Sequence, residues 1–329
     1  MRRALALPAP LADIPWIMLA PLTMLVMFGA AVLHSAAGGE FSTYAQAHLI
    51  RFGVFLVVAL VISRMPRKLV MDGAYLAYGG VLLLLLGVEI LGAVGGGSQR
   101  WLELGFIRLQ PSELMKPTIV LVLASFFHTL PIGMITTWRA LVPPLVLIGL
   151  PMGLVLLQPD LGTALAIAFG GAVTLFLAGI PLRWFIGGGV AALIAAPIAF
   201  FFALHDYQRN RVLTFLDPES DPLGTGYHIT QSKIAIGSGG IGGKGFGQGS
   251  QSHLDYLPEP HTDFVFATMA EEWGLLGGLF VLLVFGIVLR WGLTVARNAP
   301  DRFSRLLAGG MTATIFFYVA INLMMVMGL

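Results

Sequence analysis

The chain contains no cysteine, and only 11% of its 329 residues are charged. The absence of cysteine excludes disulfides, thiol catalysis and thiolate metal sites. Soluble domains have about 25% charged residues, so the small charged fraction excludes an ordinary soluble fold. The net charge is only +2 and no basic patch is interleaved with aromatic residues, so nucleic acid is not an expected partner. The seven histidines include no HExxH or paired spacing, so no tight zinc site is predicted.

Apolar residues make up most of what is present. They account for 57% of the chain, and the mean hydropathy is +0.85. The apolar runs are continuous, as in "GGVLLLLLGVEILGAVGGG", whereas strands of a membrane β-barrel alternate over about 10 residues. The first run, from Ile14 to about Leu33, has nearly the ~20 residues of a spanning helix, which favours a span over a cleaved signal peptide. The sequence therefore predicts an all-α, polytopic membrane protein with one domain, residues 1–329.

Nine apolar segments of spanning length are expected. They cover residues 14–34, 48–64, 69–93, 111–128, 140–157, 160–180, 184–204, 263–289 and 304–327. A long polar loop, residues 205–262, lies between the seventh and eighth segments. Loops of this length are functional or disordered, and this one retains several aromatic and aliphatic residues. We expect an ordered cap that contains short helices.

The distribution of Lys and Arg predicts the orientation, because cytoplasmic loops of membrane proteins carry the excess of these residues. With the N-terminus in the cytoplasm, the inside segments hold eleven basic residues: Arg2, Arg3, Arg64, Arg67, Lys68, Arg139, Arg183, Arg290, Arg297, Arg302 and Arg305. Most acidic residues fall on the opposite side. The pattern predicts a multi-pass protein of the plasma (inner) membrane, with the 205–262 loop extracytoplasmic.

Asp263 stands just before the eighth apolar segment. One interpretation is an N-cap, in which Thr262 or Asp263 accepts a hydrogen bond from the first turn of the helix. The other is a carboxylate at the outer membrane surface that acts as a general base. Glu271 and Glu272 lie about two turns further along. Ionisable groups at membrane depth indicate a functional site or a buried pair with a cation, and the pair is favoured for Glu272.

Further charged groups are predicted on the outer face. Glu113 and Lys116 share one helix face, either as an internal salt bridge or as a site for a phosphate. Arg100, beside Trp101, and Arg211 are cations that suit a diphosphate headgroup, although charged loops are more often merely solvated. The "GSGGIGGKGFGQGS" segment is not a P-loop, because Lys244 is followed by Gly245 and not by Ser or Thr. It predicts flexible or tightly turning backbone.

Four long motifs carry a resemblance to a known family. They are "GSQRWLELGFIRLQPSELMKP", "QPDLGTALAI", "RVLTFLDPESDPLGTGYHITQSKIAIGSGGIGGKGFGQGSQ" and "LPEPHTDFVFATMAEEWG". In order and spacing, over nearly the whole chain, they resemble the SEDS cell-wall polymerases, and more closely the elongation members than the division members. The resemblance implies a helical bundle of ten spans, of which nine are counted here. Either the tenth span is truncated or the natural chain is short.

The resemblance also implies an activity and its residues. Family members polymerise lipid II into glycan strands on the outer face of the membrane, together with a class B penicillin-binding protein. The essential aspartate of the family corresponds to Asp263. The lysine, tryptophan and glutamate of its motifs correspond to Lys116, Trp101 and Glu113. The predicted substrate-binding set consists of these three residues together with His261, Arg100 and Arg211.

The implied chemistry is an inverting glycosyl transfer with Asp263 as the base. Lys116, Arg211 or a divalent cation (Mg or Mn) would offset the charge of the leaving diphosphate. Two other functions stay open: a lipid II flippase, and a scaffold without catalysis that positions the penicillin-binding protein.

Overall fold

The structure is a computed structural model that describes residues 14–95, 98–104, 107–202, 209, 225–254, 256–257 and 260–328. The chain forms two compact units, which are described separately. Unit 1 consists of Met1–Ser63, Leu204–Trp291 and Ile321–Leu329. Unit 2 consists of Arg64–Ala203 and Gly292–Ala320. The prediction of a single domain stays a prediction.

Unit 1 is built from helices at both ends of the chain and from the described part of the long loop. Its elements are α2 (Trp16–Ala36), α3 (Ala45–Arg64), α11 (Thr225–Ser238), α12 (Ser250–His253), most of α13 (Val265–Asn298) and the end of α14 (Arg302–Met327). Its buried apolar side chains form two small clusters, one around Leu257 and Ala267 and one around Val32 and Met269. The described part of the loop contains the helices α11 and α12, while its role as an extracytoplasmic cap stays a prediction.

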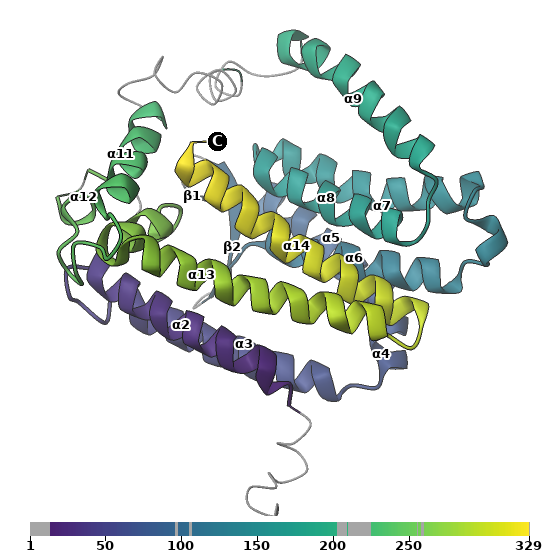
Figure 1. The fold of residues 1–329 in the computed structure, drawn as a ribbon. Helices are drawn as coiled ribbons and strands as arrows, with labels where there is room; N and C mark the ends of the chain where they lie inside the picture. The colour runs from purple at the N-terminus through teal and green to yellow at the C-terminus, as the bar shows by residue number, and fades with distance from the viewer. Residues whose placement is uncertain are drawn as a thin grey trace, which may run out of the picture. The chain divides into compact units, whose positions relative to one another are not determined.

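Unit 2 has its core around one helix, α6 (Pro111–Thr129). The other elements are α4 (Arg67–Asp72), α5 (Ala74–Leu91), the 3-10 turn η1 (Ile132–Met134), α7 (Trp138–Leu157), α8 (Leu161–Leu177), α9 (Leu182–Phe202) and the start of α14. Helices α5, α7 and α8 pack against α6 (Figure 1). Its inward side chains, such as Met115, Ile119 and Leu123, are fully buried. This packing places the first turn of α6, which carries Glu113 and Lys116, among its neighbours.

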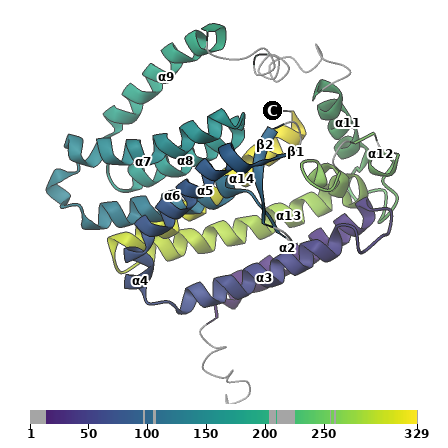
Figure 2. The same cartoon turned by 180° about the vertical axis from the view of Figure 1, so that it is seen from behind.

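A small antiparallel sheet interrupts the helical pattern of unit 2. Strands β1 (Ala93–Gly95), β2 (Ser98–Leu104) and β3 (Ile107–Leu109) pair in this order, beside α5 (Figure 2). Leu102 pairs with Leu109 and Glu103 with Arg108, whose side chains form an ion pair of 3.0 Å. The fold is helical throughout its spans, as predicted, and this small sheet is an addition in one loop that the sequence analysis did not predict: the period-2 alternation in "RWLELGFIRL" gives a hairpin.

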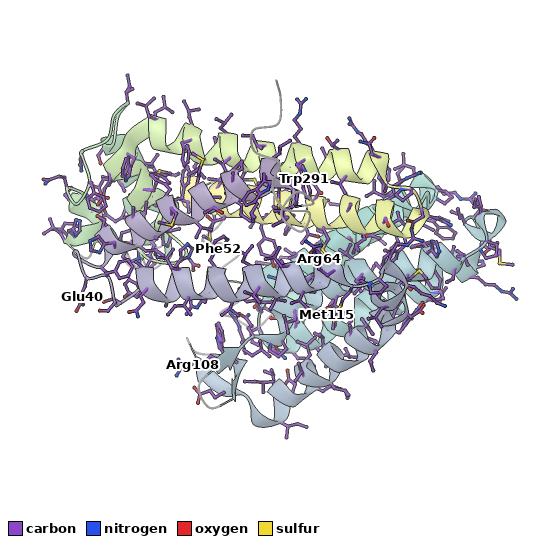
Figure 3. All side chains as sticks on the ribbon, turned by 90° about the horizontal axis from the view of Figure 1, so that it is seen from below. Glu40, Phe52, Arg64, Arg108, Met115 and Trp291 are labelled. Carbon is purple, nitrogen blue, oxygen red and sulfur yellow. The ribbon has the colours of Figure 1, made fainter. Side chains whose placement is uncertain are left out.

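Each of the nine predicted segments contains a helix within the described residues. Six helices are long and apolar enough to cross a membrane, whereas α5 and α8 are shorter. The third segment holds two helices, α4 and α5, joined at Gly73. Along α3, apolar side chains such as Phe55 and Val57 are exposed, while Phe52 is half-buried (Figure 3). Such exposed apolar faces are stable against lipid, so this is a multi-pass membrane protein, and the number of spans stays a prediction.

One end of unit 2 collects loops that the sequence assigns to a single membrane face. Arg67 forms an ion pair with Asp301, which caps α14 by accepting a hydrogen bond from the Ser304 amide at 3.0 Å. The guanidinium of Arg302 donates to the carbonyls of Leu130 (3.2 Å) and Ala178 (3.0 Å), at the C-termini of α6 and α8. A cation at two helix C-termini is electrostatically favourable. The shared end supports the predicted grouping of these loops.

Candidate active site

Asp263 lies in unit 1, in the turn of residues 260–264 that precedes α13. Its side chain is exposed, and within the described residues its carboxylate has neither a hydrogen bond nor an ion pair. An exposed carboxylate without a protein partner keeps both oxygens available for a substrate hydroxyl. The arrangement therefore suits proton transfer.

The capping alternative for this turn is not observed. The carbonyl of Phe264 accepts the first helical hydrogen bonds of α13, from the amides of Ala267 (2.9 Å) and Thr268 (3.1 Å). Neither Thr262 nor Asp263 accepts a side-chain hydrogen bond from this first turn, within the described part of the chain. The cap is thus made by backbone alone, and the carboxylate of Asp263 has no structural partner there.

Two side chains support the turn that carries Asp263. The hydroxyl of Thr268, which is fully buried, donates to the carbonyl of Pro260 at 3.2 Å. On the other side, the ring of Tyr44 stacks on the imidazole of His261, with ring centroids 3.9 Å apart and an interplanar angle of 8°. Tyr44 belongs to the α2–α3 connection. No sequence signal marks this tyrosine, because the contact joins residues more than two hundred positions apart.

Helix α13 is broken at Gly274, ten residues after Phe264. The glycine-rich loop 239–249 fills the break. Gly274 has φ +62° and ψ −158°, so the backbone leaves the helical path. The carbonyls of Glu271 and Glu272 accept hydrogen bonds from the amides of Lys244 and Gly245, both at 3.0 Å. In return, the amide of Leu275 donates to the loop at 2.9 Å. Backbone groups that a broken helix leaves without partners are therefore satisfied.

The glycines of this loop allow its close approach to α13. A side chain at Gly239 would place its Cβ 2.0 Å from the carbonyl oxygen of Ala270, and one at Gly243 would place it 2.0 Å from that of Glu272. Gly243 also has φ +80°, a conformation that favours glycine. The tightly turning backbone that the sequence predicts is confirmed.

Glu271 fastens the loop to α13 through its side chain. It has no exposed surface, and its Oε1 accepts hydrogen bonds from Lys244 Nζ at 2.6 Å and from Ser250 Oγ at 3.1 Å. The amide of Gln251, at the start of α12, donates to both carboxylate oxygens at 3.1 Å. The loop lysine and the start of α12 are thus held by a single buried carboxylate.

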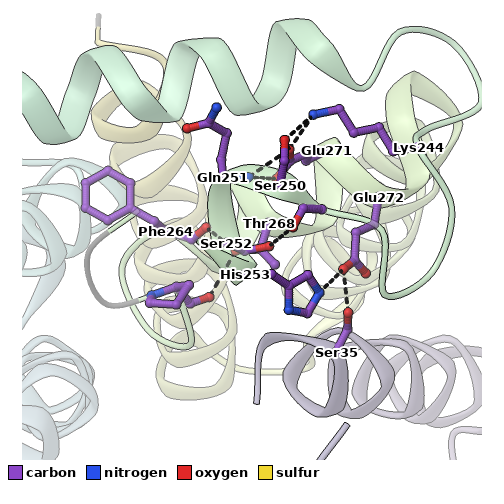
Figure 4. A network of polar contacts seen from close by, with 12 residues as sticks. Ser35, Lys244, Ser250, Gln251, Ser252, His253, Phe264, Thr268, Glu271 and Glu272 are labelled. Carbon is purple, nitrogen blue, oxygen red and sulfur yellow. Dashed lines mark hydrogen bonds and ion pairs between the residues drawn. The ribbon is translucent and has the colours of Figure 1, made fainter. Parts of the chain in front are cut away.

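Glu272 connects the same loop to α2. Its Oε1 accepts a hydrogen bond from Ser35 and lies 3.5 Å from Nε2 of His253 (Figure 4). Glu272 is 1% exposed, and its second oxygen, Oε2, has no hydrogen-bond partner among the described residues. The favoured interpretation of Glu272, a buried pair with a cation on a neighbouring helix, stays a prediction. Its partners are a histidine and a serine, which the sequence does not identify.

In unit 2, Lys116 is nearly inaccessible. It is 3% exposed, donates to Oε1 of Glu113 at 2.6 Å, and lies over the ring of Tyr318 with its Nζ 4.0 Å from the centroid. A desolvated ammonium over an aromatic face gains cation–π stabilisation. The salt bridge that the sequence suggests is therefore present. The aromatic partner is an addition that sequence spacing could not provide.

Arg100 and Trp101, on β2, have different environments. The guanidinium of Arg100 donates to the carbonyls of Gln158 (3.1 Å) and Pro159 (2.5 Å), and it lies 3.8 Å from Asp160. These contacts cap the C-terminus of α7, a structural role that uses two of the five N–H donors of Arg100. Trp101 is exposed. Substrate contact by either residue stays a prediction.

Two other predicted components are not placed by the structure. Arg211 lies outside the described residues. No group of three or more His, Asp or Glu side chains is close enough to hold a metal ion, within the residues described. The Mg or Mn considered from the sequence thus has no protein ligand set among the described residues.

Comparison with known proteins identifies the family. A model of the FtsW, RodA and SpoVE family, described as cell cycle protein, matches residues 11–329. The chain belongs to this family, the SEDS proteins.

Among related SEDS proteins, the peptidoglycan glycosyltransferase MrdB of Escherichia coli K12 is 44% identical over 95% of this chain and 84% of its own length. The probable peptidoglycan glycosyltransferase FtsW of Coxiella burnetii is 37% identical over 94% of this chain and 85% of its own length.

Solved structures of SEDS proteins share the fold. One, from work on how a peptidoglycan synthase complex coordinates polymerization and crosslinking, is 32% identical with a TM-score of 0.82, over 96% of this chain and 88% of its own. The rod shape determining protein RodA of Thermus thermophilus is 28% identical with a TM-score of 0.69, over 95% of this chain and 85% of its own. The resemblance drawn from the motifs is therefore confirmed.

Proposed function

We propose that this SEDS protein polymerises lipid II into glycan strands with Asp263 as the general base. Its class, a peptidoglycan glycosyltransferase of the RodA type that acts in cell elongation, follows from its family and its similarity to MrdB. The observation that carries the assignment to Asp263 is its exposed carboxylate just before α13, which has no hydrogen bond or ion pair with any residue that the structure describes.

The proposed reaction needs one base. Asp263 takes the proton of the acceptor 4-hydroxyl, and the resulting oxygen attacks the anomeric carbon of the donor sugar. The bond from this carbon to the phosphate oxygen breaks, and undecaprenyl diphosphate leaves with its electron pair. A single displacement inverts the anomeric carbon and requires no protein nucleophile. Base catalysis is worth typically 10²–10⁴-fold.

The leaving diphosphate needs positive charge, and Lys116 is the described residue best suited to supply it. Its ammonium is desolvated, so its charge acts more strongly than it would in water. Glu113 and Tyr318 fix its position from two sides. Arg211, Arg100, Trp101 and His261 complete the proposed substrate-binding set.

The proposed location and partner follow from the same resemblance. The N-terminus is cytoplasmic, and the 205–262 loop and Asp263 face the outside of the plasma membrane. A class B penicillin-binding protein is the proposed partner, supported by the similar structure from a peptidoglycan synthase complex.

The deciding experiment uses the purified protein, with and without the penicillin-binding protein, and lipid II as substrate. Glycan strands are measured for the parent, for Asp263→Asn, and for Glu40→Gln as a matched exposed acid in the α2–α3 connection. The expected result is a loss of at least ~10²-fold for Asp263→Asn and a parental rate for Glu40→Gln. Lipid II translocation without strands would instead indicate the flippase, and no activity of either kind would indicate the scaffold.

A further inference from the structure

We propose that Tyr44 is a positioning residue for Asp263, acting through its stacking contact with His261. The inference rests on the general-base role proposed above. It adds to the active centre a residue from the α2–α3 connection, far in sequence from the Asp263 motif.

The need for such a residue follows from the environment of Asp263. Its carboxylate has no hydrogen bond or ion pair within the described residues, so no side-chain contact fixes its direction. Its place depends on the backbone of the 260–264 turn. That turn lies outside regular helix, and its backbone joins α13 through two carbonyls: that of Phe264, and that of Thr262, which accepts from the Val265 amide at 3.4 Å. A base must be placed closely, since a misplacement of 1 Å can reduce a rate by as much as 10²-fold.

The stack holds the turn at the residue two positions before Asp263. The rings of Tyr44 and His261 are nearly parallel, with centroids 3.9 Å apart, and both residues are half-buried. On the α13 side, Thr268 holds the carbonyl of Pro260. Contacts on two sides therefore restrict the position of the turn.

Tyr44 is itself firmly attached to unit 1. Its carbonyl accepts the hydrogen bond of the His48 amide at 3.0 Å, so Tyr44 is bonded to the first turn of α3, which begins at the next residue, Ala45. At the other end of the same connection, Ser35 of α2 donates to the buried Glu272 of α13. The ring of His34 also stacks near Phe246 of the glycine-rich loop, with centroids 6.2 Å apart. The α2–α3 connection is therefore held against α13 at one end, and at its other end Tyr44 holds the 260–264 turn in place.

The test measures kcat and KM for lipid II in the complete protein with its partner. Tyr44→Ala is expected to lower kcat about 10-fold to 10²-fold because it displaces the base, and to change KM by a smaller factor, because it disturbs His261 and leaves Lys116 in place. Tyr44→Phe keeps the ring and is expected to restore most of kcat. Phe41→Ala, in the same connection but directed at His34, is the matched control with parental kinetics.

A double substitution separates positioning from general damage. In the Asp263→Asn background no base remains to be positioned, so adding Tyr44→Ala should lower the residual rate by less than about twofold. A full multiplicative loss would show that Tyr44 acts elsewhere and would overturn the proposal. A rise in KM at constant kcat would also overturn it, since that result places Tyr44 in substrate binding.

The two proposals fail in different ways. If Asp263→Asn polymerises at near the parental rate, the base itself is misassigned. If Asp263→Asn is inactive while Tyr44→Ala has parental kcat, the base stands and the positioning role is overturned. Melting temperatures of all variants are measured as well. If both Tyr44→Ala and Tyr44→Phe lose kcat and both melt at a lower temperature, the loss comes from instability. That result also overturns the positioning role of Tyr44.

Discussion

Lys244 Nζ lies 2.6 Å from Oε1 of Glu271, so a cation of the glycine-rich loop neutralises a carboxylate that has no exposed surface. Lys244 itself is 29% exposed. The two partners are therefore unequal, because only the lysine retains access to water. This difference in exposure predicts which of the two residues destabilises the protein more when its charge is removed.

Lys244→Met should destabilise the protein more than Glu271→Gln. The methionine variant leaves a buried carboxylate without its cation, which typically costs about 3 kcal/mol. The glutamine variant still accepts from Ser250 and Gln251 and lets the lysine turn toward solvent, which costs about 1 kcal/mol. Thermal melting in detergent, with the two variants side by side, checks the order. A larger loss for Glu271→Gln would contradict the proposed asymmetry.

Gly243→Ala should be among the most destabilising single changes in the loop. The new Cβ would lie 2.0 Å from the carbonyl oxygen of Glu272, at a residue with φ +80°. Backbone strain and overpacking together cost about 3 kcal/mol or more.

Gly242→Ala is the matched control for this change. Its Cβ would meet nothing within 4 Å, and Gly242 does not have a positive φ. We expect a near-parental melting temperature for Gly242→Ala and a large decrease for Gly243→Ala. Similar melting temperatures for the two would contradict the close approach of this loop to α13.

The sequence predicts much of the fold and part of the site. Continuous apolar runs locate most of the helices to within a few residues, because spanning helices must satisfy their backbone internally, but α13 continues nine residues beyond the predicted end at 289. The break at Gly274 is not visible in the same way, since an isolated glycine is also tolerated inside a helix. Its position depends on the loop that fills it. The small sheet was missed because its strands are short beside long apolar helices.

The candidate site, like the fold, could be predicted only in part from the sequence. Asp263 follows from a motif, but its lack of a capping role depends on where α13 begins. The partners of Glu271 and Lys116 lie 27 and 202 positions away, at Lys244 and Tyr318. No pattern of spacing predicts contacts that tertiary packing creates.

The charged carboxylate of Asp301 should stabilise the folded protein at neutral pH, and protonation at low pH should remove this stabilisation. Burial opposes its charge, but hydrogen bonds from the amide and hydroxyl of Ser304, with Arg67 and His128, hold the pKa of Asp301 below its ordinary value. Because the pKa of Asp301 is lower in the folded than in the unfolded protein, its carboxylate stabilises the fold at pH values above the unfolded pKa of about 4. This stabilisation is lost as the pH falls through the folded pKa.

Asp301→Asn is the corresponding test. The difference in melting temperature between parent and variant should be present at pH 7 and should shrink below about pH 4, when the parent carboxylate becomes protonated. Comparing the two proteins at each pH cancels the titration of other groups. A difference that stays constant down to pH 3 would show that the charge of Asp301 is not the source.

Lys116 allows the salt-bridge and diphosphate interpretations to be separated. Lys116→Met replaces a buried ammonium by an apolar chain of similar length, and Glu113, which is 53% exposed, can be solvated. Replacing a buried ion by an apolar group is often neutral, so the melting temperature should change little. If the ammonium offsets the charge of the leaving diphosphate, strand synthesis should fall about 10²-fold to 10³-fold.

The double variant Glu113→Gln with Lys116→Met decides between the two. If Lys116 serves only to neutralise Glu113, removing both charges should restore polymerisation, because no unpaired charge remains. If Lys116 acts on the diphosphate, the double variant should be as inactive as Lys116→Met alone. Tyr318→Phe accompanies them as a control that keeps the aromatic ring under the ammonium. Polymerisation rates and melting temperatures of the four proteins are compared in one assay. Recovery in the double variant would remove Lys116 from the proposed mechanism and leave it a structural partner of Glu113.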